Sequence, residues 1–319
     1  MSNFIIYSTK EDYYKIIYRD IIGKDNVRFI VSPVEGRNFF LRLLYKVMMS
    51  PKLDILFRGF RKFLNPLYDR KFCNKGRNVY VFFYGRLPWI DYGLLDYIKN
   101  KHPDCLTVCY FQDLIAKKNI DINKVKSQFD LLLDYDEEES QKFDLVYAPT
   151  PFSFVSQNVS SEQTTDVYFV GQAKERLADI YRMFDLLSSA GFKCDFYIAG
   201  VREENRRNQQ GFHFIEKHLP YLENLRKVSQ CKIVLELMQK GAVGYTLRTW
   251  EAIAYNKILL TNNTSLETSS LIDEYNILTF DKIDENTIEK LRNYKKKNYT
   301  YKSEFSPTKL LNKIDEYGK

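Results

Sequence analysis

Short apolar runs alternate with stretches of helical periodicity over most of the chain. The longest runs have six residues, such as VYVFFY at 79–84 and LTVCYF at 106–111, and nearly every side chain in them is apolar. Such runs are typical of strands buried on both faces, and their alternation with helices is typical of a mostly parallel sheet. The pattern predicts an α/β fold with strands at 4–7, 29–31, 79–84, 106–111, 130–133 and 145–148, and at 166–170, 195–198, 212–215, 232–235, 257–261 and 277–280.

A polar, serine-rich stretch at 153–165 separates two series of these units. We therefore expect a first domain at 1–152, a linker at 153–165, a second domain at 166–305, and a helix at 306–319 that could cross back to the first domain. Each domain would be a Rossmann-like doubly wound unit, and the two would face each other across a cleft. Doubly wound sheets bind ligands outside the carboxyl ends of their strands, so a ligand would lie between the domains.

The segment ELMQKGAVGYTLRTWE at 236–251 carries the main candidate chemistry. A strand ends before it, Gly244 and Tyr245 lie in its loop, and a helix is expected to begin near Thr246. Glycine allows a ligand to approach the backbone, and the first amides of a helix form an anion site. Thr246 can cap this helix or bind a phosphate, and Arg248 in the first turn can contact a diphosphate.

Three further side chains of the same segment could contact a ligand. Glu251 lies one turn beyond Arg248, where it can accept hydrogen bonds from ribose hydroxyls. Glu236 and Gln239 could reach a sugar; the alternative is that Glu236 simply ends its strand. The non-functional interpretation treats Thr246 as a structural cap and both Arg248 and Glu251 as solvent-facing charges.

Three stretches of the second half, DVYFVGQAKER, FYIAG and GYTLRTWEAIAYNKILLTNN, resemble the nucleotide-sugar-binding domain of GT-B glycosyltransferases. The resemblance covers residues 166–263 and is greatest to bacterial capsule and lipopolysaccharide enzymes. It implies that Glu251 binds the donor ribose and that Gly171 and Gln172 form a glycine loop facing the acceptor. It further implies that Arg176 and Arg202 contact the diphosphate, together with Thr246 and Arg248.

The sequence departs from the family pattern at two positions. Val243 stands where many retaining members carry a glutamate that meets the sugar, which leaves the stereochemical outcome open. Asn256 replaces a glycine, and asparagine is the next-best residue at positive φ.

Positive charge is concentrated in residues 37–77. This segment holds eleven Lys and Arg residues against two acids, whereas the whole chain has a net charge of only +7. Aromatic and aliphatic residues alternate with the cations at near-helical spacing, so the segment could rest on an anionic membrane. An ordinary pair of amphipathic helices explains the pattern as well. The cations proposed for a membrane or acceptor surface are Arg58, Arg61, Lys62, Arg70 and Lys71.

Composition narrows the remaining classes of protein. The proportions of hydrophobic and charged residues, 45% and 28%, are ordinary for a globular chain, and no apolar run is long enough to span a membrane. We expect a cytoplasmic protein, peripheral at the inner face of the membrane. Five cysteines without CxxC spacing indicate reduced thiols.

No metal or other cofactor is expected. Asp134-Tyr135-Asp136 has the spelling of a metal clamp, but it opens an acidic run that we interpret as a solvated loop. An inverting enzyme would also need a base from the first domain, and among Glu35, Asp91 and Asp113 our choice is Asp91.

The sequence thus predicts a metal-independent glycosyltransferase. It would move a sugar from a nucleoside diphosphate donor to a glycan acceptor, lipid-linked in our hypothesis, during synthesis of a bacterial surface polysaccharide. The alternatives are a GT-B enzyme that does not transfer, such as a nucleotide-sugar epimerase, and a non-catalytic protein that binds membranes or polyanions. Nucleic acid is not an expected partner.

Overall fold

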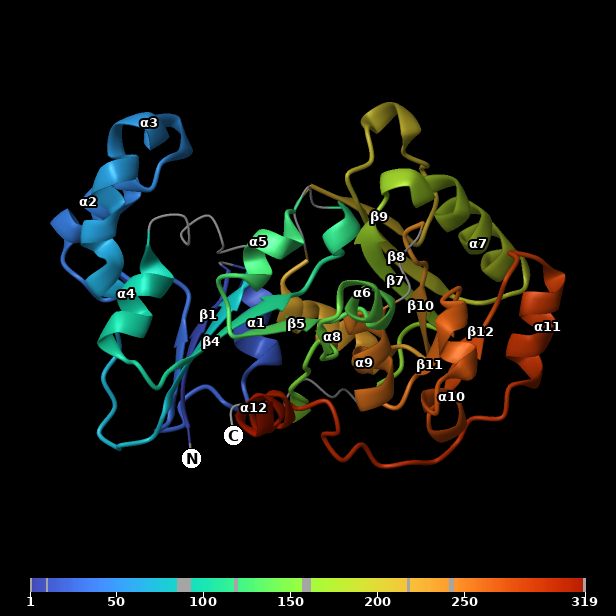
Figure 1. Cartoon of the computed structure of the whole chain (residues 1–319). Helices are drawn as coiled ribbons and strands as arrows, with labels where there is room; N and C mark the ends of the chain where they lie inside the picture. The colour runs from blue at the N-terminus through green and yellow to red at the C-terminus, as the bar shows by residue number, and fades with distance from the viewer. Residues whose placement is uncertain are drawn as a thin grey trace. The chain divides into compact units, whose positions relative to one another are not determined.

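The computed structural model describes residues 2–9, 11–84, 93–117, 120–156, 162–216, 219–240 and 244–317. The chain divides into two compact units (Figure 1): unit 1 comprises Met1–Pro149 with Pro307–Lys319, and unit 2 comprises Thr150–Ser306. Each unit contains one six-stranded sheet in which all strand pairs are parallel. The predicted α/β fold class is therefore confirmed.

Unit 1 has the strand order β2-β1-β3-β4-β5-β6. Its strands are β1 (Asn3–Tyr7), β2 (Val27–Ile30), β3 (Asn78–Phe83), β4 (Leu106–Phe111), β5 (Leu131–Asp134) and β6 (Val146–Tyr147). Its α-helices are α1 (Asp12–Ile17), α2 (Phe39–Met48), α3 (Asp54–Phe57), α4 (Leu94–Lys101), α5 (Ile122–Lys126), α6 (Glu137–Phe143) and α12 (Pro307–Tyr317). Its 3-10 helices include η1 (Pro51–Leu53), η2 (Arg58–Tyr68) and η4 (Ile115–Lys117).

Unit 2 has the order β12-β11-β10-β7-β8-β9. Its strands are β7 (Val167–Gln172), β8 (Cys194–Ala199), β9 (Phe212–Ile215), β10 (Ile233–Glu236), β11 (Ile258–Thr261) and β12 (Ile277–Thr279). Its helices are α7 (Leu177–Ser189), α8 (Tyr221–Gln230), α9 (Leu247–Ala254), α10 (Leu271–Glu274) and α11 (Glu285–Asn293), with 3-10 turns η6 (Lys174–Arg176), η7 (Glu203–Asn205) and η8 (Thr264–Thr268).

The strand order of unit 2 creates a topological switch point between β7 and β10. The chain runs outward from β7 through β8 to β9, and then returns to the other side of β7 for β10, β11 and β12. The helices that follow the two central strands, α7 and α9, lie on opposite faces of the sheet. Helix α11 lies on the face of α7, and α8 lies on the face of α9 (Figure 1). A crevice for a ligand forms at such a point, outside the carboxyl ends of the strands.

Two segments of the chain do not follow the expected order of first domain, linker and second domain. The described part of the expected linker packs within unit 2, where Ser153 and Val155 are buried and the Val155 carbonyl accepts a hydrogen bond of 2.9 Å from Tyr255 Oη. The chain end returns to unit 1 as α12, whose Lys313 Nζ donates to the Tyr147 carbonyl over 2.6 Å.

Candidate functional site

Two cationic side chains bridge the switch point of the unit 2 sheet. Arg176 in η6 donates from Nη2 to the Gln172 carbonyl over 2.7 Å and from Nη1 to the Leu237 carbonyl. Lys174 Nζ donates to Gln239 Oε1 over 2.9 Å. Because Gln172 ends β7 and the other two partners follow β10, both cations are fixed where a doubly wound sheet binds its ligand.

Gly171 lies against the Phe169 ring and beside the Arg176 guanidinium. A Cβ atom added to Gly171 would lie 3.2 Å from the Phe169 ring and 3.4 Å from Arg176 Nη2. A side chain at position 171 would therefore be tight against Phe169 and in van der Waals contact with the guanidinium. Arg176 Nε is buried and has no hydrogen-bond partner among the described residues.

Thr246 caps α9 at its expected start. Its Oγ1 accepts a hydrogen bond of 3.0 Å from the Arg248 amide, and the same hydroxyl donates to Glu236 Oε1. The prediction of a cap is confirmed. Since the hydroxyl proton is already donated to Glu236, Thr246 is not placed to donate it to a phosphate.

Glu236 is buried at a junction of three elements. It ends β10 and accepts hydrogen bonds from Thr246 and Thr249 of the α9 segment, and one of 2.6 Å from Thr261 at the end of β11. Burial raises the pKa of this carboxyl, while the threonine hydroxyls oppose the rise. The carboxylate is turned inward, which differs from the expected reach toward a sugar.

Arg248 and Glu251 form an ion pair inside unit 2. Glu251 is fully buried, and its Oε2 pairs with Arg248 Nη1. Its Oε1 accepts hydrogen bonds of 2.7 Å from Tyr221 Oη and 3.1 Å from Asn224 Nδ2. Burial raises the pKa of the Glu251 carboxyl, and the Arg248 cation opposes that rise.

Asn224 connects the pair to the sheet. Its Oδ1 accepts from Arg248 Nη1 over 2.8 Å and from Tyr168 Oη over 3.0 Å. The ion pair is thus held by β7, α8 and α9 together. For Glu251 to bind a ribose, as the resemblance implies, at least one of these partners would have to be exchanged, and that role stays a prediction.

The Arg248 side chain is 20% exposed. Its hydrogen bonds and ion pair in the described part of the chain all use Nη1. Arg248 can therefore neutralise Glu251 through one nitrogen and offer the others to an anion at the start of α9.

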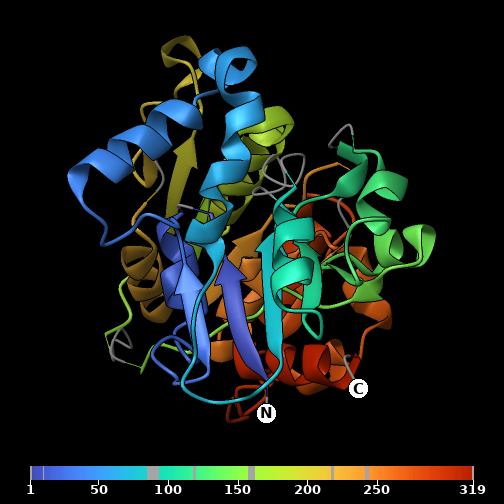
Figure 2. The ribbon, with the colours of Figure 1, turned by 60° about the vertical axis from the view of Figure 1, so that its left-hand side comes forward.

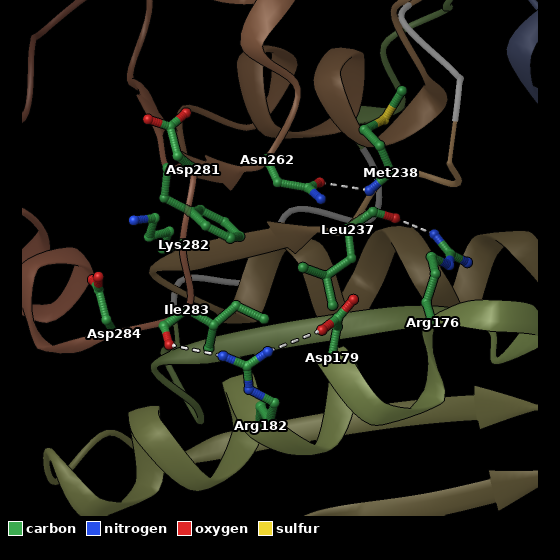
Figure 3. A pocket seen from close by; sticks show the side chains of 11 residues that line it. Arg176, Asp179, Arg182, Leu237, Met238, Asn262, Asp281, Lys282, Ile283 and Asp284 are labelled. Carbon is green, nitrogen blue, oxygen red and sulfur yellow. Dashed lines mark hydrogen bonds and ion pairs between the residues drawn. The ribbon is translucent and has the colours of Figure 1, made fainter.

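A pocket of about 310 Å³ opens at the same edge of the sheet (Figure 3). Arg182 lies between Asp179 Oδ1 and the Ile283 carbonyl, each 3.5 Å away, while Asn262 Oδ1 accepts from the Met238 amide over 2.6 Å. The lining residues are Arg176, Asp179, Arg182, Leu237, Met238, Asn262, Phe280, Asp281, Lys282, Ile283 and Asp284. Sequence reasoning found only Arg176 among them.

The other predicted donor residues are scattered. Arg202 is exposed and lies 3.9 Å from Glu204, so it is not part of the Arg248 network. Tyr245 Oη donates to Ser269 Oγ over 3.0 Å, and the Gly244 carbonyl accepts from Asn263 Nδ2 over 3.4 Å. The proposed base Asp91 lies outside the described residues.

The predicted basic surface is only partly exposed. Arg58, Lys62 and Lys71 are exposed. Arg61 is 5% exposed, because its guanidinium contacts the Met48 carbonyl at 2.7 Å and Asp54 at 2.5 Å. Arg70 is half-buried and donates to the carbonyls of Leu67 and Pro33. Arg61 and Arg70 are therefore structural, which corrects their assignment to this surface.

The interpretation of Asp134-Tyr135-Asp136 as a solvated loop is wrong. Asp134 ends β5 and Asp136 caps α6 by accepting from the Glu139 amide over 2.9 Å, and both side chains are fully buried. Burial raises the pKa of Asp134 to about 7. Independence from metals stays a prediction. None of the described helices has the length and apolar character needed to cross a bilayer.

No protein-family model and no curated protein matches the sequence. Solved structures do match. A trehalose-6-phosphate synthase shares 9% identity at a TM-score of 0.59, with 99% of this chain and 97% of that chain covered. The UDP-forming α,α-trehalose-phosphate synthase of Burkholderia xenovorans, in complex with glucose-6-phosphate, shares 10% identity at a TM-score of 0.58, with both chains fully covered.

The UDP-GlcNAc 2-epimerase of Methanocaldococcus jannaschii shares 12% identity at a TM-score of 0.50, with 98% of this chain and 99% of that chain covered. Identities this low establish the fold alone. With its two parallel six-stranded sheets, the chain has the GT-B fold.

Proposed function

We propose that the protein transfers a sugar from a nucleoside diphosphate sugar to a glycan acceptor. The observation that carries this proposal is the convergence of cations on the end of β10. Thr246, which caps α9, is bonded to Glu236, and Arg176 is bonded to the next residue, Leu237. The start of α9 and the bridging cations of η6 thus meet at adjacent residues of one strand end.

This arrangement suits the leaving group of glycosyl transfer. Negative charge develops on the departing diphosphate, and fixed cations with the positive end of a helix dipole stabilise it without reorganisation. Arg248 would contact the diphosphate through Nε and Nη2, and Arg176 and Lys174 would contact it from the β7 side. No metal ion is required for this role.

The acceptor and the cellular role belong to the same proposal. We propose a lipid-linked glycan acceptor, synthesis of a bacterial surface polysaccharide, and a peripheral location at the inner face of the cytoplasmic membrane. Support comes from the resemblance of residues 166–263 to capsule and lipopolysaccharide enzymes and from the basic, aromatic segment of unit 1. The catalytic base would come from unit 1, and Asp91 is our choice.

A nucleotide-sugar epimerase is the second candidate, favoured by the match to the UDP-GlcNAc 2-epimerase. Both enzymes would bind the same donor, but only a transferase releases nucleoside diphosphate in proportion to added acceptor. An epimerase would instead convert the donor into an isomer in the absence of any acceptor.

A thermal-shift screen with UDP, GDP, CMP and TDP tests donor binding. One of them should stabilise the protein, by about 2.7 kcal/mol at a concentration of one hundred times its Kd. Lys174→Gln should weaken that nucleotide about tenfold, because it removes a charge-assisted contact to phosphate.

Lys193→Gln is the matched control for this screen. Lys193 is also exposed, but it precedes β8 and lies at the opposite edge of the same sheet. If no nucleotide stabilises the wild type, the donor site is refuted and the non-catalytic alternative is favoured. An equal loss in both lysine variants would show that nucleotide binding does not use the switch point.

A further inference from the structure

An exposed apolar surface covers α2, α3 and η2 of unit 1. Eleven large hydrophobic side chains are exposed among the described residues, and eight of them lie between residues 39 and 63. Figures 1 and 2 show α2 and α3 standing out from the unit 1 sheet. We define the α2–η2 surface by the eight side chains Phe39, Phe40, Leu43, Leu44, Ile55, Leu56, Phe60 and Phe63.

Helix α2 is apolar on two opposite sides. At about 100° per residue, Tyr45 and Met48 fall on one side, and both are buried. Phe39, Phe40 and Leu43 fall on the other side, Leu44 lies between the two sides, and all four are exposed. A helix of a globular protein needs one apolar stripe to pack on its core, so folding of unit 1 does not account for the second stripe.

The next two elements extend the exposed stripe. In η2, Arg61, Leu64, Asn65 and Tyr68 are buried, whereas the rings of Phe60 and Phe63 are exposed and lie 6.5 Å apart. Ile55 of α3 is 96% exposed. Contiguous exposed apolar patches on soluble proteins mark sites of interaction with proteins or membranes.

Cations accompany this surface, and among the described residues none of the exposed ones forms an ion pair with an acid. Asp54 is the only acidic residue in the segment from 37 to 64, and it pairs with the buried Arg61 at 2.5 Å. Six exposed cations of the segment therefore keep their excess charge: Arg37, Arg42, Lys46, Lys52, Arg58 and Lys62.

We propose that the α2–η2 surface inserts into an anionic lipid bilayer. The exposed phenylalanine, leucine and isoleucine side chains enter the boundary between headgroups and acyl chains, while the six cations contact lipid phosphates. This inference rests on the proposed location at a membrane, but not on the proposed reaction. The proposed mode of binding is insertion rather than purely electrostatic adsorption. Most of the binding free energy would come from apolar side chains such as Phe40, Ile55 and Phe63.

A second copy of the chain fits this surface less well than lipid. A two-fold symmetric dimer would place the same patch on both sides of its interface, and the six cations of each copy would face those of the other. Charge complementarity therefore favours an anionic partner. Because the apolar side chains also require burial, a bilayer with anionic headgroups satisfies both requirements.

Vesicle binding of the full-length protein tests the proposal. The wild type should co-sediment with phosphatidylcholine vesicles that contain phosphatidylglycerol and not with phosphatidylcholine alone. Phe40→Ser/Ile55→Ser/Phe63→Ser should lower the partition coefficient at least about tenfold. Arg58→Gln/Lys62→Gln should lower it about fivefold per cation at low salt, and less at high salt.

Insertion has its own readout. A tryptophan in Phe40→Trp should shift to the blue on binding and be quenched by lipids with brominated acyl chains, whereas a residue adsorbed at the headgroups would not be quenched. Leu222→Ser and Lys193→Gln/Lys290→Gln make the same changes at exposed positions of unit 2 and should bind like the wild type.

Three results would overturn the proposal: no binding of the wild type to anionic vesicles, unchanged binding of the triple serine variant, or a soluble dimer that this variant dissociates while vesicles remain unbound. The nucleotide thermal shift of the triple variant should equal that of the wild type. A failure of lipid binding is therefore distinguishable from a failure of the donor site.

Discussion

The Arg248 guanidinium neutralises a carboxylate that has no exposed surface. Glu251 accepts hydrogen bonds from Tyr221 and Asn224 and is paired with Arg248, so its charge is compensated by a single cation. Removing one member of a buried ion pair leaves the other uncompensated, which costs more than removing both. Arg248→Ala should therefore lower the stability of the protein, whatever its effect on donor binding.

We expect Arg248→Ala to destabilise the protein by about 3–5 kcal/mol. Arg248→Met/Glu251→Gln removes both charges and keeps a polar partner for Tyr221, so it should recover most of that loss. Urea denaturation followed by the fluorescence of the buried Trp250 in unit 2 measures both changes.

The double variant also separates the two roles of Arg248. If it folds like the wild type and loses nucleotide binding, the guanidinium is needed at the diphosphate. A loss below about 1 kcal/mol for Arg248→Ala alone would contradict the charged pair and would indicate that Glu251 is buried as the neutral acid.

Local sequence was sufficient for some of these residues and insufficient for others. Thr246 caps α9 through its own backbone neighbours, and Arg248 and Glu251 lie three positions apart on one helix, so spacing alone places them together. Asn224 and Tyr168 reach the pair from α8 and β7, which only the tertiary fold brings near. The inward turn of Glu236 likewise depends on Thr261 of a neighbouring strand.

Elements with apolar side chains on both faces were the easiest to predict. The strand expected at 106–111 coincides with β4, an interior strand of a parallel sheet whose six residues are all buried. Charge patterns were less informative. Arg58 and Arg61 are equivalent in the basic segment, yet the packing of η2 exposes the first and buries the second.

The turn between β5 and α6 contains a carboxyl group that titrates near neutrality. Asp134 is fully buried, and its pKa is raised by burial and by the nearby Asp136 and Glu139 to about 7. In the unfolded chain the group would ionise near its ordinary value of 3.8. Between these values the folded state keeps a proton that the unfolded state has lost, so Asp134 makes stability fall as pH rises.

We expect Asp134→Asn to remove this decrease of stability with rising pH. At about 1.4 kcal/mol per unit of pKa shift, Asp134 costs the wild type up to about 4 kcal/mol between pH 4 and 7. Urea unfolding, followed by circular dichroism at several pH values in this range, should show that the free energy of unfolding of the variant increases relative to that of the wild type as pH rises.

Asp130→Asn is the control at the other end of β5. Burial would raise the pKa of Asp130, but hydrogen bonds from Lys99 and Thr107 outweigh burial and lower it. Asp130 therefore stays ionised in both states above pH 5, and its loss should leave the slope between pH 5 and 7 unchanged. Parallel pH profiles for Asp134→Asn and the wild type would contradict a protonated Asp134.

The two units are not consecutive along the chain. Residues 150–306 form unit 2, and the last residues return to unit 1 as α12. This helix buries Leu310, Leu311 and Ile314, and Lys24 Nζ of unit 1 donates to Thr308 Oγ1 over 3.0 Å. Unit 1 therefore depends on a segment that is translated after the whole of unit 2.

We expect Leu310→Ala/Ile314→Ala to destabilise unit 1 selectively. Each truncation of a buried side chain costs about 2–5 kcal/mol through lost apolar contact and the cavity that remains. Amide hydrogen exchange measured by mass spectrometry should show faster exchange in peptides from β1, β3 and β4, and unchanged exchange in peptides from β10 and β11.

Ile288→Ala/Leu291→Ala makes the corresponding change in α11, where both side chains are buried in the core of unit 2. It should reverse the pattern, with faster exchange in β10 and β11 and little change in unit 1. Both double variants remove one leucine and one isoleucine side chain. A difference between their exchange patterns would therefore reflect where the side chains lie and not how much apolar volume is lost. If either double variant accelerated exchange equally in both sheets, the units would unfold as one cooperative body, and α12 could not be assigned to the stability of unit 1 alone.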